Sequence, residues 1–205
     1  MSHRILFAAA LLALTPTASL LIAAPAHAQA VNGYKFLKAV EDRDGDEATK
    51  MLELPGGTLV NTRDSTTGRS AIHIVTQRRD LVWMNFMISK GARVDAADNA
   101  GNTALTIATD LRFLEGAQLL LDKGANVNLG GPRGETPLIK AVLNRDLPMV
   151  RLLVSHGADP DKSDSFSGNS ARDLAKRDPR AAAILQALDA PKPKVQKPVM
   201  GPGLN

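Results

Sequence analysis

Gly134-Glu135-Thr136-Pro137-Leu138, followed by Gly157-Ala158-Asp159, is the stretch that decides the fold of this chain. The same phrase occurs twice upstream, as Gly101-Asn102-Thr103-Ala104-Leu105 and as Gly68-Arg69-Ser70-Ala71-Ile72. The leading glycines step by 33 residues (101 − 68 and 134 − 101), and so do the Gly-Ala pairs (124 − 91 and 157 − 124). Two independent sets of glycines with one period identify a repeat protein.

The period and the residues resemble the ankyrin repeat, in which Gly-x-Thr-Pro-Leu-His opens a first helix and Leu-Leu followed by Gly-Ala-Asp closes a second. The best copy runs from Gly134 to Asp161. The resemblance covers residues 34–188. It implies an all-α fold, an ankyrin-repeat solenoid of about five helix-turn-helix units with short β-hairpin fingers. The expected units are residues 34–64, 65–97, 98–130, 131–163 and 164–188.

Helix boundaries within each unit follow from polar residues at fixed positions. A hydroxyl residue that can cap the first helix recurs at one position, as Ser70, Thr103, Thr136 and Ser170. Each second helix ends in Lys or His followed by Gly, which suits the negative end of the helix dipole and a left-handed turn. We therefore expect second helices over residues 81–89, 114–122 and 147–155. In the terminal units we expect helices over 36–40, 46–52 and 180–188.

One finger departs from the pattern. Residues Leu129 to Arg133 lack the acidic residue that Asp98 supplies in the preceding finger. This third finger is expected to be either looser than the others or shaped for a partner.

The first 28 residues have the pattern of a secretory signal peptide. Ser2-His3-Arg4 is a basic start, Ile5 to Leu14 is an apolar run, and Ala26-His27-Ala28 is a small-x-small cleavage site. Cleavage is expected between Ala28 and Gln29. The alternative, a retained anchor with stable membrane insertion, is disfavoured because Pro16 follows an apolar run well short of the ~20 residues that span a bilayer. The expected location is the bacterial periplasm or the exterior.

Composition narrows the remaining classes. The chain has no cysteine, so stability must come from stacked units rather than disulfides. Residues 29–188 carry 21 basic and 20 acidic side chains, and aromatic residues are 3% of the chain. This balance argues against a nucleic-acid partner, which favours a basic face with stacking aromatics. The Pro/Lys-rich tail, residues 189–205, is expected to be disordered, and it serves either as a solubilising end or as an electrostatic contact to an anionic surface.

The sequence lacks the motifs of an enzyme. After signal removal the histidines are His73, at the position of the family's Thr-Pro-Leu-His histidine, and His156, at a helix end. Neither has metal-ligand spacing, and no nucleophile elbow or phosphate-binding loop is present. We expect no catalytic residues, no metal and no cofactor. A hydrolase is the weakest of the classes considered.

Arginine forms a further ladder at residues 79, 112 and 145, with Arg43 in a similar place. The family often has glycine at this position. One interpretation is a row of guanidiniums near the concave groove that binds an acidic partner, because arginine pairs bidentately with carboxylates. The other is that each arginine complements a helix C-terminus beside Asp80 or Asp146. Under the first, changing Arg79, Arg112 and Arg145 to alanine abolishes partner capture and leaves the melting temperature nearly unchanged.

The resemblance implies a non-catalytic scaffold that acts as a monomer and binds another protein on the concave surface of inner helices and fingers. The alternative is an envelope stress or oxidant-defence factor that protects a partner enzyme through the same surface. The family's usual contact positions correspond here to Thr67, Arg69, Gln77, Arg78, Arg79, Asn99, Asn102, Thr109, Asp110, Arg112, Arg133, Glu135, Leu143, Asn144 and Arg145.

Overall fold

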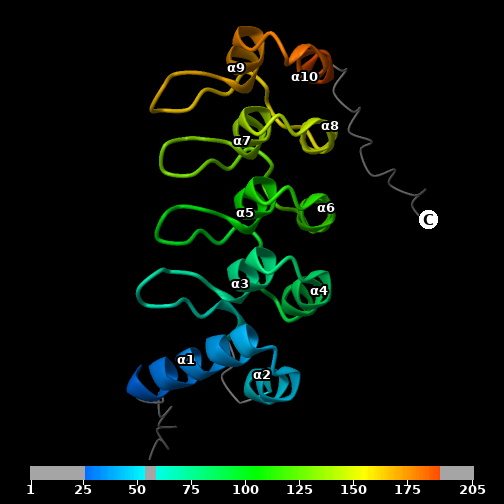
Figure 1. Cartoon of the computed structure of the whole chain (residues 1–205). Coiled ribbons are helices and arrows are strands. Elements are labelled where there is room, and N and C mark those ends of the chain that lie inside the picture. The colour runs from blue at the N-terminus through cyan, green and yellow to red at the C-terminus, as the bar shows by residue number, and fades with distance from the viewer. Residues whose placement is uncertain (1–25, 54–58, 190–205) are drawn as a thin grey trace, which may run out of the picture.

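The computed structural model describes residues 26–53 and 59–189 and builds them from ten α-helices and one 3-10 turn. The chain stacks helix pairs into a single array (Figure 1). The elements are α1 (Ala26–Asp42), α2 (Gly45–Leu52), η1 (Leu59–Asn61), α3 (Ala71–Gln77), α4 (Leu81–Ser89), α5 (Ala104–Asp110), α6 (Leu114–Asp122), α7 (Pro137–Leu143), α8 (Leu147–Ser155), α9 (Ala171–Arg177) and α10 (Ala182–Leu188).

The helices form two columns. The inner helices α1, α3, α5, α7 and α9 lie one above another, and the outer helices lie beside them (Figure 1). Loops that we call fingers project from the inner column at residues 62–69, 95–102, 128–135 and 161–169. The all-α array of about five units that the sequence predicted is confirmed. The predicted bounds of α4, α6 and α8 coincide with the observed ones.

Hydroxyl caps explain where the inner helices begin. Thr103, Thr136 and Ser170 each accept a hydrogen bond from the backbone N–H three residues later, at 3.1–3.2 Å. Such a bond satisfies one of the free donors of the first turn. The predicted cap position is therefore confirmed at these three residues. Ser70 is the N-cap of α3 as well, in a capping box with His73, and its hydroxyl lies 2.9 Å from Nδ1 of that ring.

The first helix is longer than the sequence pattern predicted. It begins at Ala26 rather than near Phe36, so it extends past the inner column and lies beneath the first finger (Figure 1). Gly33 is buried there, and a Cβ at this position would lie 2.6 Å from Cγ2 of Thr62. The predicted cleavage after Ala28 would remove only the first three residues of α1. Residues 1–25, which hold most of the predicted signal peptide, residues 54–58 and the tail beyond Asp189 lie outside the described residues.

The fingers are loops rather than regular β-hairpins, which corrects the sequence prediction. Three of them have one isolated antiparallel bridge each, between residues 63 and 70, 97 and 103, and 163 and 170. In the third finger the described contacts are hydrogen bonds of backbone turns. The Gly134 N–H donates to the Gly131 carbonyl at 2.8 Å. A Cβ on Gly130 would lie 2.6 Å from the Gly134 oxygen, so glycine permits this close turn.

Each finger is held against the next at a glycine with positive φ. Gly101 has φ 75°, and a Cβ there would lie 2.1 Å from Cδ of Pro132 in the following finger. Gly68 is covered in the same way by the Asn99 side chain, and Gly134 by the backbone of Ser165. Gly168 has φ 69° but no atom within 4 Å of such a Cβ, because no finger follows it in the described chain.

This difference gives a stability test with a control inside the chain. Gly168→Ala should cost about 1 kcal/mol, since alanine is strained in the left-handed region. Gly101→Ala should cost about 1–3 kcal/mol more, because the new methyl overlaps Pro132. Urea unfolding followed by circular dichroism measures both. Equal losses for the two variants would show that the fingers do not pack on these glycines.

Candidate functional site

The inner face, formed by the fingers and the inner helices, holds two hollows. The N-terminal groove, about 420 Å³, lies between α1 and the first finger. The central hollow, about 310 Å³, lies between the second and third fingers. Each hollow opens to solvent, and exposed side chains lie beside it. They are therefore two places on the described part of this face where another molecule can make contact beyond a flat surface.

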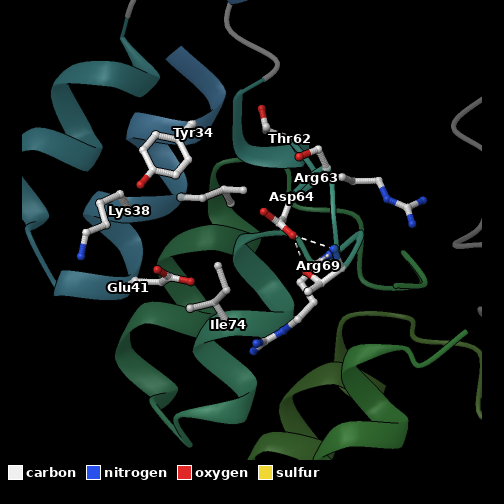
Figure 2. A pocket seen from close by; sticks show the side chains of 11 residues that line it. Tyr34, Lys38, Glu41, Thr62, Arg63, Asp64, Arg69 and Ile74 are labelled. Carbon is white, nitrogen blue, oxygen red and sulfur yellow. Dashed lines mark hydrogen bonds between the residues drawn. The ribbon is translucent and has the colours of Figure 1, made fainter. Parts of the chain in front are cut away.

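The N-terminal groove has an apolar floor and a polar rim. Leu37 and Ile74 are 6% and 8% exposed and line it from α1 and α3. Figure 2 shows Tyr34, Lys38 and Glu41 on the α1 side, and it shows Thr62, Arg63, Asp64 and Arg69 on the finger side. Tyr34 is 69% exposed, so most of its ring area is available for contact.

Most of the charges in this groove already have partners. Asp64 accepts bonds from the N–H and hydroxyl of Thr67 at 2.6 and 2.7 Å, and these hold its pKa below the usual range. Lys38 pairs with Asp42 at 2.7 Å, and Arg63 donates to the Gly68 carbonyl. Among the described residues, neither the Arg69 guanidinium nor the Glu41 carboxylate has a hydrogen bond or an ion pair.

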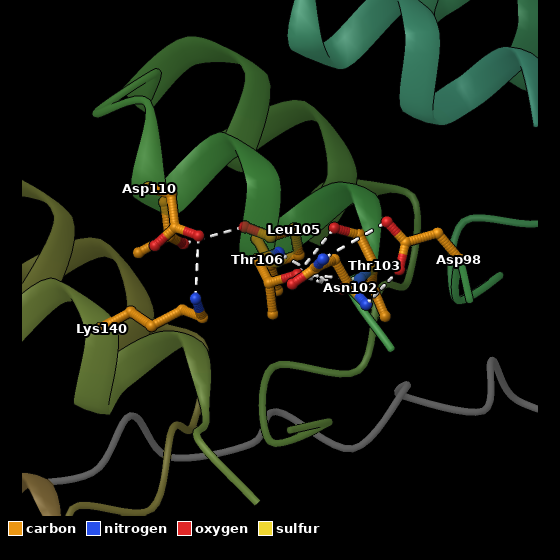
Figure 3. A network of polar contacts seen from close by, with 8 residues as sticks. Asp98, Asn102, Thr103, Leu105, Thr106, Asp110 and Lys140 are labelled. Carbon is orange, nitrogen blue, oxygen red and sulfur yellow. Dashed lines mark hydrogen bonds and ion pairs between the residues drawn. The ribbon is translucent and has the colours of Figure 1, made fainter. Parts of the chain in front are cut away.

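The central hollow is built on a fixed polar network, drawn in Figure 3. Asp98 accepts from the backbone N–H of Asn102 at 2.8 Å, which secures the second finger on α5. Lys140 of α7 pairs with Asp110 of α5 at 2.8 Å, which ties two neighbouring units together. The Glu135 carboxylate lines the same hollow without an ion pair in the described part of the chain.

A proline interrupts the contacts between fingers at this hollow. The second finger donates from Asn99 N–H to the Thr67 carbonyl at 2.9 Å, and the fourth donates from Ser165 N–H to the Arg133 carbonyl at 2.8 Å. Pro132 lies at the corresponding point of the third finger and has no N–H to donate. The Ala100 carbonyl consequently has no hydrogen-bond donor among the described residues.

The structure places only part of the predicted contact set in the two hollows. Thr67 and Arg69 line the N-terminal groove, and Asn102, Arg133 and Glu135 line the central hollow. The Asn99 side chain lies at a fingertip and donates to the Thr66 carbonyl.

Thr109 was predicted wrongly as a contact residue. It is 0% exposed, and its hydroxyl donates to the Leu105 carbonyl within the helix.

The arginine ladder does not form a row in a groove beside the fingers. Arg79 follows α3 at the end opposite the finger, about 10 Å away at 1.5 Å per residue. Its φ is +56°, and Arg43, Arg112 and Arg145 share this left-handed conformation at +62°, +52° and +51°. This is the physical reason why glycine suits the position.

Each of these arginines also reaches the next unit of the array. The Arg43 guanidinium lies 3.6 Å from Asp80, and that of Arg79 lies over the Phe113 ring. Arg112 donates to the Asn144 carbonyl, and Arg145 pairs with Asp178. The geometry therefore favours the structural interpretation of the ladder, although its contact is with the following unit rather than with its own helix end. Asp80 and Asp146 instead cap α4 and α8.

The remaining predicted contact residues lie at the C-terminal ends of the inner helices, where the chain turns toward the outer helix. Arg78 donates to the Val40 carbonyl of α1 and lies over the Trp83 ring, so it joins the first two units. Asn144 supplies the carbonyl to which Arg112 donates, and Asp110 is paired with Lys140. Gln77 and Leu143 are exposed.

Sequence reasoning missed the α1 wall of the groove and the aromatic tip of the last finger. Lys38 and Glu41 precede Arg43 as Ile74 and Gln77 precede Arg79, so the arginine ladder itself could have located them. Phe166 is 76% exposed and stacks against Arg133, and no repeat in the sequence marks it.

His73 links the second unit to the third. The Ser70 backbone N–H donates to Nδ1 at 3.1 Å, and an amide N–H cannot accept, so Nδ1 carries no proton. Nε2 therefore carries the proton and donates to the Asn102 carbonyl at 3.1 Å. The ring is 0% exposed, and its burial lowers the pKa below the ordinary 6.5. His73 thus has a structural role, because its ring joins the N-terminus of α3 to the second finger.

Comparison with known families agrees with this architecture. A family model described as ankyrin repeats in three copies matches residues 36–131, and a second, ankyrin repeats in many copies, matches residues 120–175. The chain is therefore an ankyrin-repeat protein. Such repeats form protein–protein interaction scaffolds and are typically non-catalytic binding modules.

Two further observations concern other classes of site. Within the described residues, no helix is both long and apolar enough to cross a bilayer. The same residues bring together no group of three or more side chains suited to hold a metal ion.

The histidine geometry predicts acid sensitivity. Because the folded pKa of His73 is lowered, the unfolded chain binds a proton below about pH 6.5 that the folded chain excludes. The free energy of unfolding should therefore keep its maximum contribution from His73 above that pH and decrease as the pH falls below it. His73→Thr, which copies Thr106 of the next unit, should flatten this dependence. Urea unfolding between pH 7.5 and 5.5 tests it, and parallel curves for wild type and variant would contradict it.

The left-handed arginines give a second comparison. Arg79→Ala keeps a Cβ in the strained conformation and loses the Phe113 contact, whereas Arg79→Gly loses the same contact and removes the strain. The glycine variant should therefore be more stable than the alanine variant by about 1 kcal/mol in chemical unfolding. If alanine is equal to or better than glycine, residue 79 does not hold a left-handed backbone in solution.

Proposed function

We propose that this protein is a non-catalytic scaffold of the bacterial periplasm or exterior that binds a partner protein on its inner face. Each unit is fixed to the next through its own side chains, and the inner face retains polar groups that this packing leaves unused. The single observation that carries the proposal is the pair of hollows on this face, each next to a charge without an ion pair among the described residues, Arg69 in one and Glu135 in the other.

A stacked array suits this role for a physical reason. Its core is continuous across units, from Phe36 and Ile72 to Leu105, Leu138 and Ile184. Residues on the inner face can therefore vary without opening a cavity in the core. The predicted signal peptide and the absence of cysteine fit a protein that is stable outside the cytoplasm without disulfides.

Crosslinking in living cells tests the partner surface. A photoreactive residue at Ala100 or Thr67, both exposed on the inner face, should give a crosslinked protein partner in the periplasmic fraction. The same residue at Val82 or Arg151, both exposed on outer helices, should give none. Mass spectrometry identifies the partner, and the mature chain should begin at Gln29.

Two outcomes would contradict the proposal. Crosslinks of equal yield at Val82 and Ala100 would show that the inner face is not the preferred surface. An uncleaved chain confined to the cytoplasm would exclude the periplasmic location.

A further inference from the structure

We infer that the N-terminal groove is a docking site for an acidic–aliphatic segment of the partner, in which a carboxylate pairs with Arg69 and an aliphatic side chain packs between Tyr34 and Ile74. The inference rests on the proposed function and specifies where on the inner face the contact is made and by what chemistry.

The shape of the groove favours a side chain rather than a flat contact. Its volume of about 420 Å³ exceeds that of the central hollow, and it is the less open because α1 closes one side. No finger precedes the first one in the described chain, so α1 takes that place and adds a helical wall. The Tyr34 ring is exposed beside the floor of Leu37 and Ile74, and within the described residues nothing covers it, so it provides apolar area for a bound side chain.

The free donors of Arg69 favour an acidic segment. Of the other two cations that line the groove, Lys38 is paired with Asp42 and Arg63 donates to the Gly68 carbonyl. The Asp64 carboxylate is engaged by the backbone N–H of Thr66 and by Thr67, so it has fewer free lone pairs for a ligand. Arg69 has five N–H donors in a planar fork and no partner in the described chain, and a carboxylate is the group that fits this fork bidentately.

The same position in other units supplies tolerated replacements for Arg69. Asn102 and Glu135 follow the left-handed glycine of their units as Arg69 follows Gly68. Arg69→Asn and Arg69→Glu are therefore compatible with the fold. Glu41→Gln likewise copies Gln77, and it removes the carboxylate that opposes an acidic ligand.

Fluorescence anisotropy with a defined probe tests the inference on the full mature chain. The probe is a fluorescein-labelled peptide, Gly-Glu-Glu-Leu-Leu-Glu-Glu-Gly, and its counterpart has lysine in place of glutamate. Arg69→Glu should weaken acidic-peptide binding by about tenfold or more, and Arg69→Asn by a smaller factor. Glu41→Gln should strengthen it. Arg151→Glu, on the outer helix α8, changes the net charge by the same amount as Arg69→Glu. It should weaken peptide binding only slightly, through long-range attraction that salt screens.

Each alternative outcome overturns the inference. Acidic-peptide binding that Arg69→Glu leaves intact would place the contact elsewhere, for example on the lysines at 192, 194 and 197. Equal binding of the lysine peptide, or no binding of either, would exclude the stated chemistry. Unchanged melting temperatures show that the variants fold. The crosslinking experiment is independent of the peptide, so inner-face crosslinks without acidic-peptide binding would refute only this inference.

Discussion

The structure depends on one repeated contact, the packing of each finger onto the left-handed glycine of the finger before it. Gly101 must be glycine for two reasons, because its φ is positive and because Pro132 fills the space of a side chain. Gly168 has the same backbone, and no finger of the described chain covers it. The array is therefore a sum of nearest-neighbour contacts, and its two ends differ from its interior.

Contacts between units also decide which polar side chains remain for a partner. The arginines at 43, 79, 112 and 145 are all used to hold the following unit. Arg78 and Lys140 are committed to the preceding unit, through the Val40 carbonyl and Asp110. Arg69 and Glu135 lie on the inner face without such partners in the part of the chain that the structure describes. An acidic ligand, which the sequence suggested through the arginine ladder, is better matched by Arg69 in the N-terminal groove.

The first helix changes the inner face at one end. α1 is 17 residues long, against seven for α3, α5, α7 and α9, and its extra length lies against the first finger. The terminal unit thus does more than shield the core from water, because it forms a wall of the larger hollow. The central hollow arises differently, because Pro132 cannot donate the hydrogen bond that joins neighbouring fingers elsewhere.

The sequence alone determined the array, because a period of 33 residues repeats the helix boundaries, the inner-helix caps and the left-handed glycines of the three central units. It predicted α4, α6 and α8 to the residue, since local signals such as Lys90-Gly91 end those helices. Only the tertiary structure decided which polar residues are free. Thr109 and Arg112 occupy typical contact positions, but one is buried and the other bonds to the next unit. Those outcomes depend on neighbours a whole repeat away, and spacing along the chain does not encode which side chains meet there.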